Sequence, residues 1–211
     1  MYSPTLPTAL SVPEKSKPAS LPAAVTPINA QQRLLRRATF AVLALVGGGT
    51  DLVSKSLVFH WRGWPRGDNR WWLIDDVFGV ETSINHGALF GLGSGFTAGF
   101  VALSAVALLV IGYFVFWRRN LIDWWLTTSL GLVTGGIIGN LYDRLGLFHT
   151  ADTPAAFKYG VRDWILFRLE GVPLFDPQWP NFNIADCCLV VGACLLAIHS
   201  LRAESKDDKA A

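Results

Sequence analysis

The chain has 211 residues, of which 51% are hydrophobic, with a mean hydropathy of +0.35 and nine tryptophans, a composition outside the usual range for a soluble globular domain and typical of a membrane protein. Its net charge of +2 is small and its basic residues are scattered, so nucleic acid is not an expected partner. The three cysteines share one apolar stretch without histidine or cysteine at metal-ligand spacing, so we expect no metal and no other cofactor.

The N-terminal segment differs in composition from the rest of the chain. Residues 1–32 hold most of the prolines and no apolar run, so we expect them to form a disordered cytoplasmic tail. The first apolar run follows the arginines of residues 33–37, which is typical of an uncleaved signal anchor. We therefore expect a membrane domain over residues 33–202 and a second cytoplasmic tail over residues 203–211.

Four apolar stretches of about 20 residues are long enough to cross a hydrocarbon core of about 30 Å. The short loop between the second and third stretches contains two arginines, whereas the first and third loops are long and rich in Trp, Gly and Pro. Lys and Arg are more numerous on the side of the short loop, which indicates that both termini are cytoplasmic. The four predicted spans are residues 38–59, 96–117, 121–145 and 184–201.

Aromatic and small residues support this assignment. Tryptophans lie at or near the predicted span ends, as an interfacial belt requires: Trp61, Trp64, Trp117, Trp124, Trp125 and Trp179. Glycines on the third span allow close approach of neighbouring helices: Gly131, Gly135, Gly136 and Gly139. The sequence therefore predicts an all-α polytopic membrane protein with four transmembrane helices.

The first span contains two charged residues. An ionisable group within a span costs a few kcal/mol, so each needs a partner or a function. Asp51 lies about 20 Å along the helix from residue 38, in the outer third of the membrane, and Lys55 follows on the same face. An ion pair that only neutralises itself explains this motif equally well when it is taken alone.

Polar residues also lie at the outer ends of the third and fourth spans. Asn140, Asp143 and Arg144 share one helical face at the end of the third span. At the start of the fourth span, capping by Asn183 and the interaction of Asp186 with the helix dipole favour a structural role. Independent caps and ion pairs would nevertheless not be expected to place the polar groups of three spans at one membrane face.

Two loop segments add polar groups near the same face. Asn85 and Gly87 precede the second span, where Gly87 lets the backbone approach a ligand and Asn85 offers both a donor and an acceptor. Asp163 lies in the third loop between apolar and aromatic neighbours. Taken in isolation, Asp163 is more simply interpreted as an exposed loop residue.

The chemistry available to these residues is that of carboxylates. The predicted spans offer no Ser/His/Lys set, and the sequence offers no nucleophilic Cys/His pair and no histidine-rich metal cage, so serine, cysteine and metal mechanisms are poorly supported. Two carboxyl groups close together cannot both ionise easily, so one holds a proton while the other activates water, which is the chemistry of an aspartyl peptidase. The candidate carboxylates are Asp51, Asp143, Asp163 and Asp186.

Two other classes of function remain as alternatives. A small transporter or channel would use intramembrane charges as an ion path, but it would predict repeated halves, broken helices and charges near the midplane. A non-catalytic membrane scaffold would use the same polar groups to hold its helices together. We find no internal repeat, and the charges lie at one side of the membrane.

Five short motifs occur in a fixed order on this four-span frame, and together they resemble lipoprotein signal peptidase, the type II signal peptidase family. The resemblance covers residues 38–201. The motifs are Asp51-x3-Lys55, Asn85-x-Gly87-Ala88-x-Phe90-Gly91, Gly135-Gly136-x2-Gly139-Asn140-x2-Asp143-Arg144, Val161-x-Asp163 and Phe182-Asn183-x-Ala185-Asp186.

The resemblance implies a multi-pass protein of the bacterial cytoplasmic (inner) membrane with a small extracytoplasmic β-sheet and a short helix over an active site that faces the periplasm. We expect part of residues 71–90 to form this β-cradle. The implied activity is aspartic endopeptidase cleavage of a prolipoprotein on the N-terminal side of a cysteine that carries diacylglycerol. The implied partners are the diacylated prolipoprotein and membrane lipid, and we expect a monomer.

The resemblance also assigns the catalytic dyad, to Asp163 and Asp186. Spacing alone would pair Asp143 with Asp186, since both lie at helix ends, and this alternative stays open. Arg162 and Trp164 flank Asp163 where the family commonly has Val-Val-Asp-Phe, and the first and third loops are longer than usual. The residues expected to support the dyad and the substrate are Asp51, Lys55, Asn85, Gly87, Asn140, Asp143, Arg144, Asn183 and Ala185.

Overall fold

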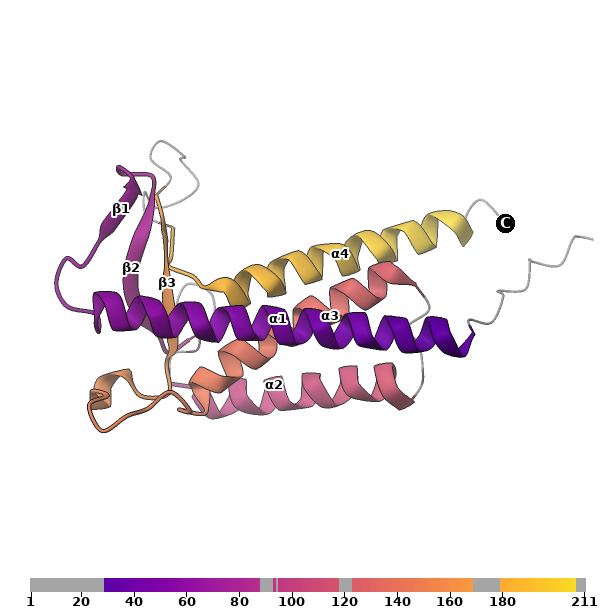
Figure 1. The fold of residues 1–211 in the computed structure, drawn as a ribbon, viewed down its shortest axis with the longest axis horizontal. Helices are drawn as coiled ribbons and strands as arrows, with labels where there is room; N and C mark the ends of the chain where they lie inside the picture. The colour runs from indigo at the N-terminus through magenta and orange to yellow at the C-terminus, as the bar shows by residue number, and fades with distance from the viewer. Residues whose placement is uncertain (1–28, 88–92, 94, 118–122, 169–178, 208–211) are drawn as a thin grey trace, which may run out of the picture.

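The described residues of the computed structural model form an elongated bundle of helices with a small sheet at one end (Figure 1). The description covers residues 29–87, 93, 95–117, 123–168 and 179–207. The bundle helices are α1 (Ala30–Arg62), α2 (Thr97–Gly112) with the π-helical turn η2 (Tyr113–Trp117), α3 (Trp124–Arg144) and α4 (Ile184–Asp207). The sheet contains β1 (Trp71–Ile74), β2 (Phe78–Asn85) and β3 (Val161–Phe167), and a short 3-10 turn, η3 (Ala155–Phe157), precedes β3.

Helix α1 extends beyond its predicted span at both ends. At its start, the Asn29 side chain accepts a hydrogen bond from the Gln32 backbone, and the Gln32 side chain accepts one from the Asn29 backbone, so a capping box fixes the first turn. At its end, Gly63 takes a positive φ of 78° that glycine adopts readily. The helix therefore begins inside the expected N-terminal tail, whose residues 1–28 lie outside the described residues, as do residues 208–211 of the C-terminal tail.

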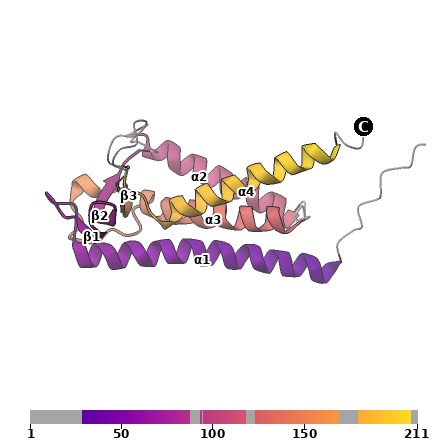
Figure 2. The ribbon, with the colours of Figure 1, turned by 90° about the horizontal axis from the view of Figure 1, so that it is seen from above.

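Three of the described helices are long and apolar enough to cross a membrane: Ala30–Arg62, Thr97–Trp117 and Ile184–Arg202. Helix α2 is apolar on all sides, and its side chains Leu103 and Leu109 are 67% and 73% exposed, as expected for a surface that lies against lipid. The third predicted span, residues 121–145, corresponds to α3, which packs between α1 and α4 (Figure 2). Helix α3, which carries Asn140, Asp143 and Arg144 near its end, is not among these three helices.

Helix α3 lies unusually close to its neighbours because its glycines have no side chain. A Cβ atom on Gly135 would lie 2.9 Å from the carbonyl oxygen of Ala44 in α1, and one on Gly136 would lie 2.7 Å from Cγ of Leu189 in α4. The predicted role of small residues on this helix is confirmed. This close approach brings the polar groups of α1, α3 and α4 within hydrogen-bonding distance of one another.

The sheet is antiparallel with the strand order β1-β2-β3. Strands β1 and β2 lie within residues 71–90, where we expected the cradle. The third strand comes from the segment that contains Asp163, which we had interpreted as a loop, and it pairs with β2 so that Ser83 lies opposite Asp163 and Asn85 lies opposite Val161. That interpretation was wrong because the pairing partner lies far away in the sequence.

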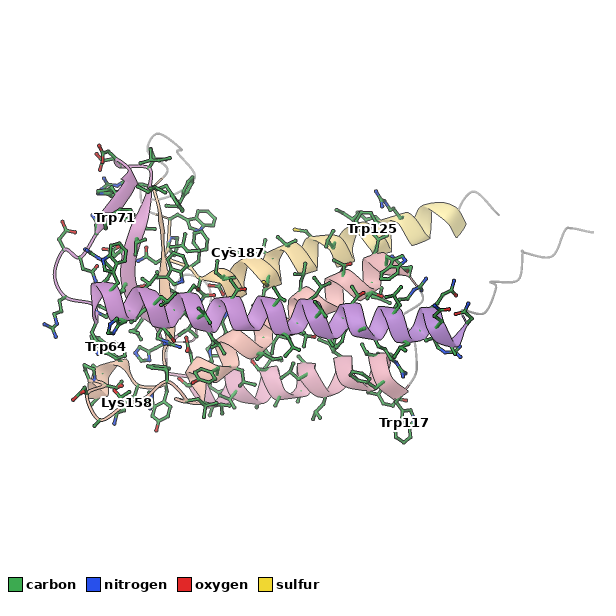
Figure 3. The ribbon with its side chains drawn as sticks, viewed as in Figure 1. Trp64, Trp71, Trp117, Trp125, Lys158 and Cys187 are labelled. Atoms are coloured by element: carbon green, nitrogen blue, oxygen red, sulfur yellow. The ribbon has the colours of Figure 1, made fainter. Side chains whose placement is uncertain are left out.

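The two ends of the helical bundle can be told apart by the chain ends and the tryptophans. Helix α1 begins and α4 ends at the end of the bundle that lies away from the sheet (Figure 1). Tryptophans mark both ends, with Trp64 and Trp71 near the sheet and Trp117 and Trp125 at the opposite end (Figure 3). Such a distribution is expected for two interfacial aromatic belts.

Candidate active site

A layer of buried polar side chains lies where α1, α3, α4 and β3 meet. None of these side chains belongs to a residue that is more than 6% exposed, so each must find its partners within the protein. We call this set the polar layer; it consists of Asp51, Lys55, Asn140, Asp143, Arg162, Asp163 and Asn183.

Lys55 connects the first and third helices within the polar layer. Its Nζ lies 2.7 Å from Oδ2 of Asp51 and 3.1 Å from Oδ2 of Asp143, and it donates a hydrogen bond of 3.1 Å to Oδ1 of Asn140. The other carboxylate oxygen of Asp51 accepts a hydrogen bond of 2.9 Å from the backbone N–H of Ala185, at the start of α4. The Asp51–Lys55 pair is therefore more than a self-neutralising pair, because it joins α1 to α3 and α4.

Asp143 is held between two cations. Besides Lys55, it meets Arg162, whose backbone N–H donates a hydrogen bond of 2.9 Å to Oδ2 and whose Nε and Nη2 donate bonds of 3.1 and 2.8 Å to Oδ1. Arg162 is 5% exposed. Arg162 was not among the predicted site residues, although an arginine in place of the family's valine, directly before a candidate carboxylate, was the signal that could have identified it.

Asn183 joins the two predicted catalytic carboxylates. Its side-chain amide donates hydrogen bonds of 2.6 Å to Oδ1 of Asp163 and 3.1 Å to Oδ1 of Asn140, and its Oδ1 accepts one of 2.9 Å from the backbone N–H of Asp186. Asp186 in turn accepts from the Asn183 backbone and from the side chain of Asn140, at 3.2 and 2.8 Å. The capping role predicted for Asn183 is confirmed, and the same residue reaches Asp163.

Asp163 is 1% exposed, so its interpretation as an exposed residue was wrong. Burial and the nearby negative charge of Asp186 raise the pKa of Asp163 to about 8, against the opposing effect of hydrogen bonds from Asn183 and Asn85 and the charge of Lys55. At neutral pH the side chain of Asp163 is therefore mostly protonated, and it lies near the carboxyl group of Asp186.

Asn85, Gly87 and Arg144 form one edge of the site. The side chain of Asn85 accepts a hydrogen bond of 2.9 Å from the backbone N–H of Gly87, and Nη2 of Arg144 donates one of 3.0 Å to the carbonyl oxygen of Gly87. The guanidinium of Arg144 also lies 5.0 Å from the ring centre of Phe100 in α2. These contacts attach the end of β2 to the ends of α2 and α3.

A cavity of about 780 Å³ opens beside the polar layer. Asn85, Asn140, Arg144 and Asp186 contribute polar groups to its wall. Most of the lining is apolar and comes from β3, α3, α4 and the segment that precedes α4, including Ile137, Phe167, Trp179, Phe182, Leu189 and Val190. A cavity with apolar walls and a few convergent polar groups suits an apolar peptide whose backbone is fixed at one point.

The family model of Signal peptidase (SPase) II matches residues 41–202, which contain the polar layer and the cavity. The chain belongs to the signal peptidase II family. A lipoprotein signal peptidase of Rhodopirellula baltica is 46% identical over 165 residues, which cover 78% of this chain and 72% of the relative. One of Pseudomonas fluorescens is 33% identical over 181 residues, which cover 83% of this chain and 94% of the relative.

Solved structures support the fold. A bacterial membrane enzyme determined by the in meso method at 2.3 Å resolution superposes with a TM-score of 0.65 at 22% identity, covering 80% of this chain and 91% of that structure. Membership of the signal peptidase II family establishes that the chain is an aspartic peptidase of the bacterial membrane that cleaves prolipoprotein signal peptides. This family membership excludes the two alternative functions, a small transporter or channel and a non-catalytic membrane scaffold.

Proposed function

We propose that this signal peptidase II uses Asp163 and Asp186 as its catalytic dyad and cleaves on the N-terminal side of a cysteine that carries diacylglycerol. The observation that carries this proposal is the environment of Asp163. Its side chain is buried beside Asp186, and burial and the charge of Asp186 together raise its pKa to about 8. One protonated and one ionised carboxyl group side by side are what an aspartic peptidase requires.

In this mechanism the two carboxyl groups have different roles. Asp186 lines the cavity and accepts a proton from a water molecule, whose oxygen then bonds to the scissile carbonyl carbon. Protonated Asp163 donates a hydrogen bond to the carbonyl oxygen, on which negative charge develops. When the C–N bond breaks, the proton that Asp186 accepted passes to the leaving amine, so the dyad regains its starting state.

Asp143 is less suited to the role of dyad partner. Both of its oxygens accept hydrogen bonds from Arg162, and Lys55 lies 3.1 Å from one of them. Because both oxygens already accept hydrogen bonds from cations, neither is free to carry a proton and donate it to the substrate. Asp163 instead meets amide donors from Asn183 and Asn85, which leave its proton available.

The remaining predicted residues support the dyad and the substrate. Asn140 and Asn183 fix both carboxyl groups through their amides. Asp51 and Lys55 anchor the first turn of α4 and Asp143, while Ala185 is fully buried and donates its N–H to Asp51. Asn85, Gly87 and Arg144 form the edge of the cavity where a peptide backbone would lie.

The apolar cavity is suited to the signal-peptide segment of the substrate. This segment enters sideways between the helices, and the diacylglycerol chains stay in the lipid. Helix α3 completes a set of four transmembrane helices, because its 21 residues span about 30 Å at 1.5 Å per residue. Since it packs between α1 and α4, it needs less apolar surface than a helix that faces lipid. Both termini are then cytoplasmic, the site faces the periplasm, and one chain forms the whole site as a monomer.

The decisive experiment measures cleavage of a diacylated prolipoprotein peptide in detergent by two variants, Asp163→Asn and Asp186→Asn. Each substitution removes a group that transfers or holds a proton, so kcat is expected to fall by about 10²–10⁴-fold. Thermal unfolding should show that both variants remain folded, because an amide replaces each carboxyl group without a change of shape.

Asp152→Asn provides the matched control. Asp152 is exposed in the segment between α3 and β3, and its variant should cleave the peptide at the rate of the unmodified protein. If folded Asp163→Asn or Asp186→Asn kept the activity of this control, the assigned dyad would be wrong.

A further inference from the structure

Arg162 stands next to Asp163 on β3 and attaches this strand to helix α3. Three of its N–H groups, one from the backbone and two from the guanidinium, donate to the carboxylate of Asp143 at 2.8 to 3.1 Å. Paired donors of this kind fix both the distance and the angle between two segments. The position of β3 relative to α3 is therefore set at the residue that precedes Asp163.

Aromatic rings enclose the same guanidinium. Its Cζ lies 4.4 Å from the ring centre of Phe148 and 5.9 Å from that of Phe59, near the end of α1. Phe148 belongs to the long segment between α3 and β3. Arg162 thus contacts α1, α3 and this segment at once, and a buried cation with such contacts has little freedom to move.

Arg162 also balances the buried charges. Within the polar layer, the carboxylates of Asp51 and Asp143 face the cations Lys55 and Arg162. Without Arg162, the two carboxylates would share Lys55 alone, and one buried negative charge would lack a direct partner. The residues around this charge would then shift, and β3 would shift with them because it is bonded directly to Asp143.

Successive residues of a strand point to opposite faces, so Arg162 and Asp163 make their contacts on opposite sides of β3. We propose that Arg162 is a positioning residue for the peptidase reaction: by its paired hydrogen bonds to Asp143 it holds β3 where Asp163 meets Asn183. This inference rests on the proposed dyad, and it adds a residue that the family motif does not contain at this position.

The test compares Arg162→Met and Arg162→Lys with the unmodified protein, using kcat, KM and thermal unfolding with the diacylated peptide in detergent. Arg162→Met should lower kcat by about 10²-fold with little change in KM, because a small displacement of a catalytic group affects the reaction more than binding. Arg162→Lys keeps the charge but lacks the paired donors, so kcat should fall by roughly 10-fold.

Arg168→Met is the matched control. Arg168 follows the end of β3, and its guanidinium pairs with the exposed Asp76 instead of a carboxylate of the polar layer. This variant should retain the kcat of the unmodified protein. If Arg162→Met fails to fold, Arg162→Lys decides alone.

A folded Arg162→Lys or Arg162→Met protein with unchanged kcat would overturn the positioning role. This outcome differs from failure of the dyad assignment, which would appear as activity in folded Asp163→Asn. Inactive Asp163→Asn together with fully active Arg162 variants would therefore leave the dyad intact and remove only the inference about Arg162.

Discussion

The two sides of the candidate active site hold their carboxylates in different ways. On the side of α1 and α3, Asp51 and Asp143 meet the cations Lys55 and Arg162. On the side of β3 and α4, Asp163 and Asp186 meet the amides of Asn140, Asn183 and Asn85. The first arrangement fixes charge and joins the helices, whereas the second leaves a proton to be shared. Similar residues therefore join the helices in one place and, in the proposed mechanism, catalyse the reaction a short distance away.

The largest expected effect on stability comes from breaking the cationic side. Asp143→Asn leaves Lys55 and Arg162 buried with too little negative charge, so the free energy of unfolding should fall by about 3–5 kcal/mol. Asp163→Asn should change it by no more than about 1 kcal/mol, because the group it replaces is already neutral below pH 8. Denaturation in mixed detergent micelles measures the change in the free energy of unfolding for both variants.

Equal losses of stability in Asp143→Asn and Asp163→Asn would contradict this distinction. The double variant Lys55→Met with Asp51→Asn offers a further check, because it removes one charge of each sign. It should be more stable than Lys55→Met alone, which leaves Asp51 without its cation.

A smaller effect tests the close packing that brings the two sides together. A Cβ atom on Gly139 would collide with the carboxylate of Asp51 and lie 3.1 Å from Cβ of Ala185. Gly139→Ala should therefore lower the free energy of unfolding by about 1–3 kcal/mol. Gly49→Ala is the control, because a Cβ atom on Gly49 would have no neighbour within 4 Å, and removing a helical glycine there should stabilise the protein by up to about 1 kcal/mol.

If Gly139→Ala proved as stable as Gly49→Ala, the helices would lie farther apart at Gly139 than in the structure, and the close packing would be contradicted. Thermal unfolding of both variants in the same detergent decides between these outcomes.

The sequence predicts those parts of the site that lie on helices. Regular spacing along the helix places Asn140 and Asp143 near one face, and hydropathy locates the ends of α2 with η2 and of α3 to within a few residues. The sequence then predicts that the polar clusters of α1, α3 and α4 converge, because each lies at the same end of its predicted span. Helical periodicity and span length can be read from short stretches of sequence, so these parts of the site could be predicted.

The parts that depend on β3 could not be predicted in the same way. Burial of Asp163 follows from the pairing of Val161 with Asn85, which lie far apart in the chain. In the sequence alone, Arg162 and Asp163 resemble neighbouring charges on the surface. In the structure, Arg162 contacts Asp143 and Asp163 contacts Asn183. The bare residue pattern therefore favoured Asp143 as the partner of Asp186, and the family resemblance was needed to indicate Asp163.

The most direct test of this account is the infrared spectrum of the protein in detergent as a function of pH, with Asp163→Asn as the reference. The account predicts a band from a protonated carboxyl group that persists up to pH about 8, disappears as the pH rises further, and is absent from Asp163→Asn. Ionisation of Asp163 near its ordinary pKa of 3.8, with no such band at neutral pH, would contradict it.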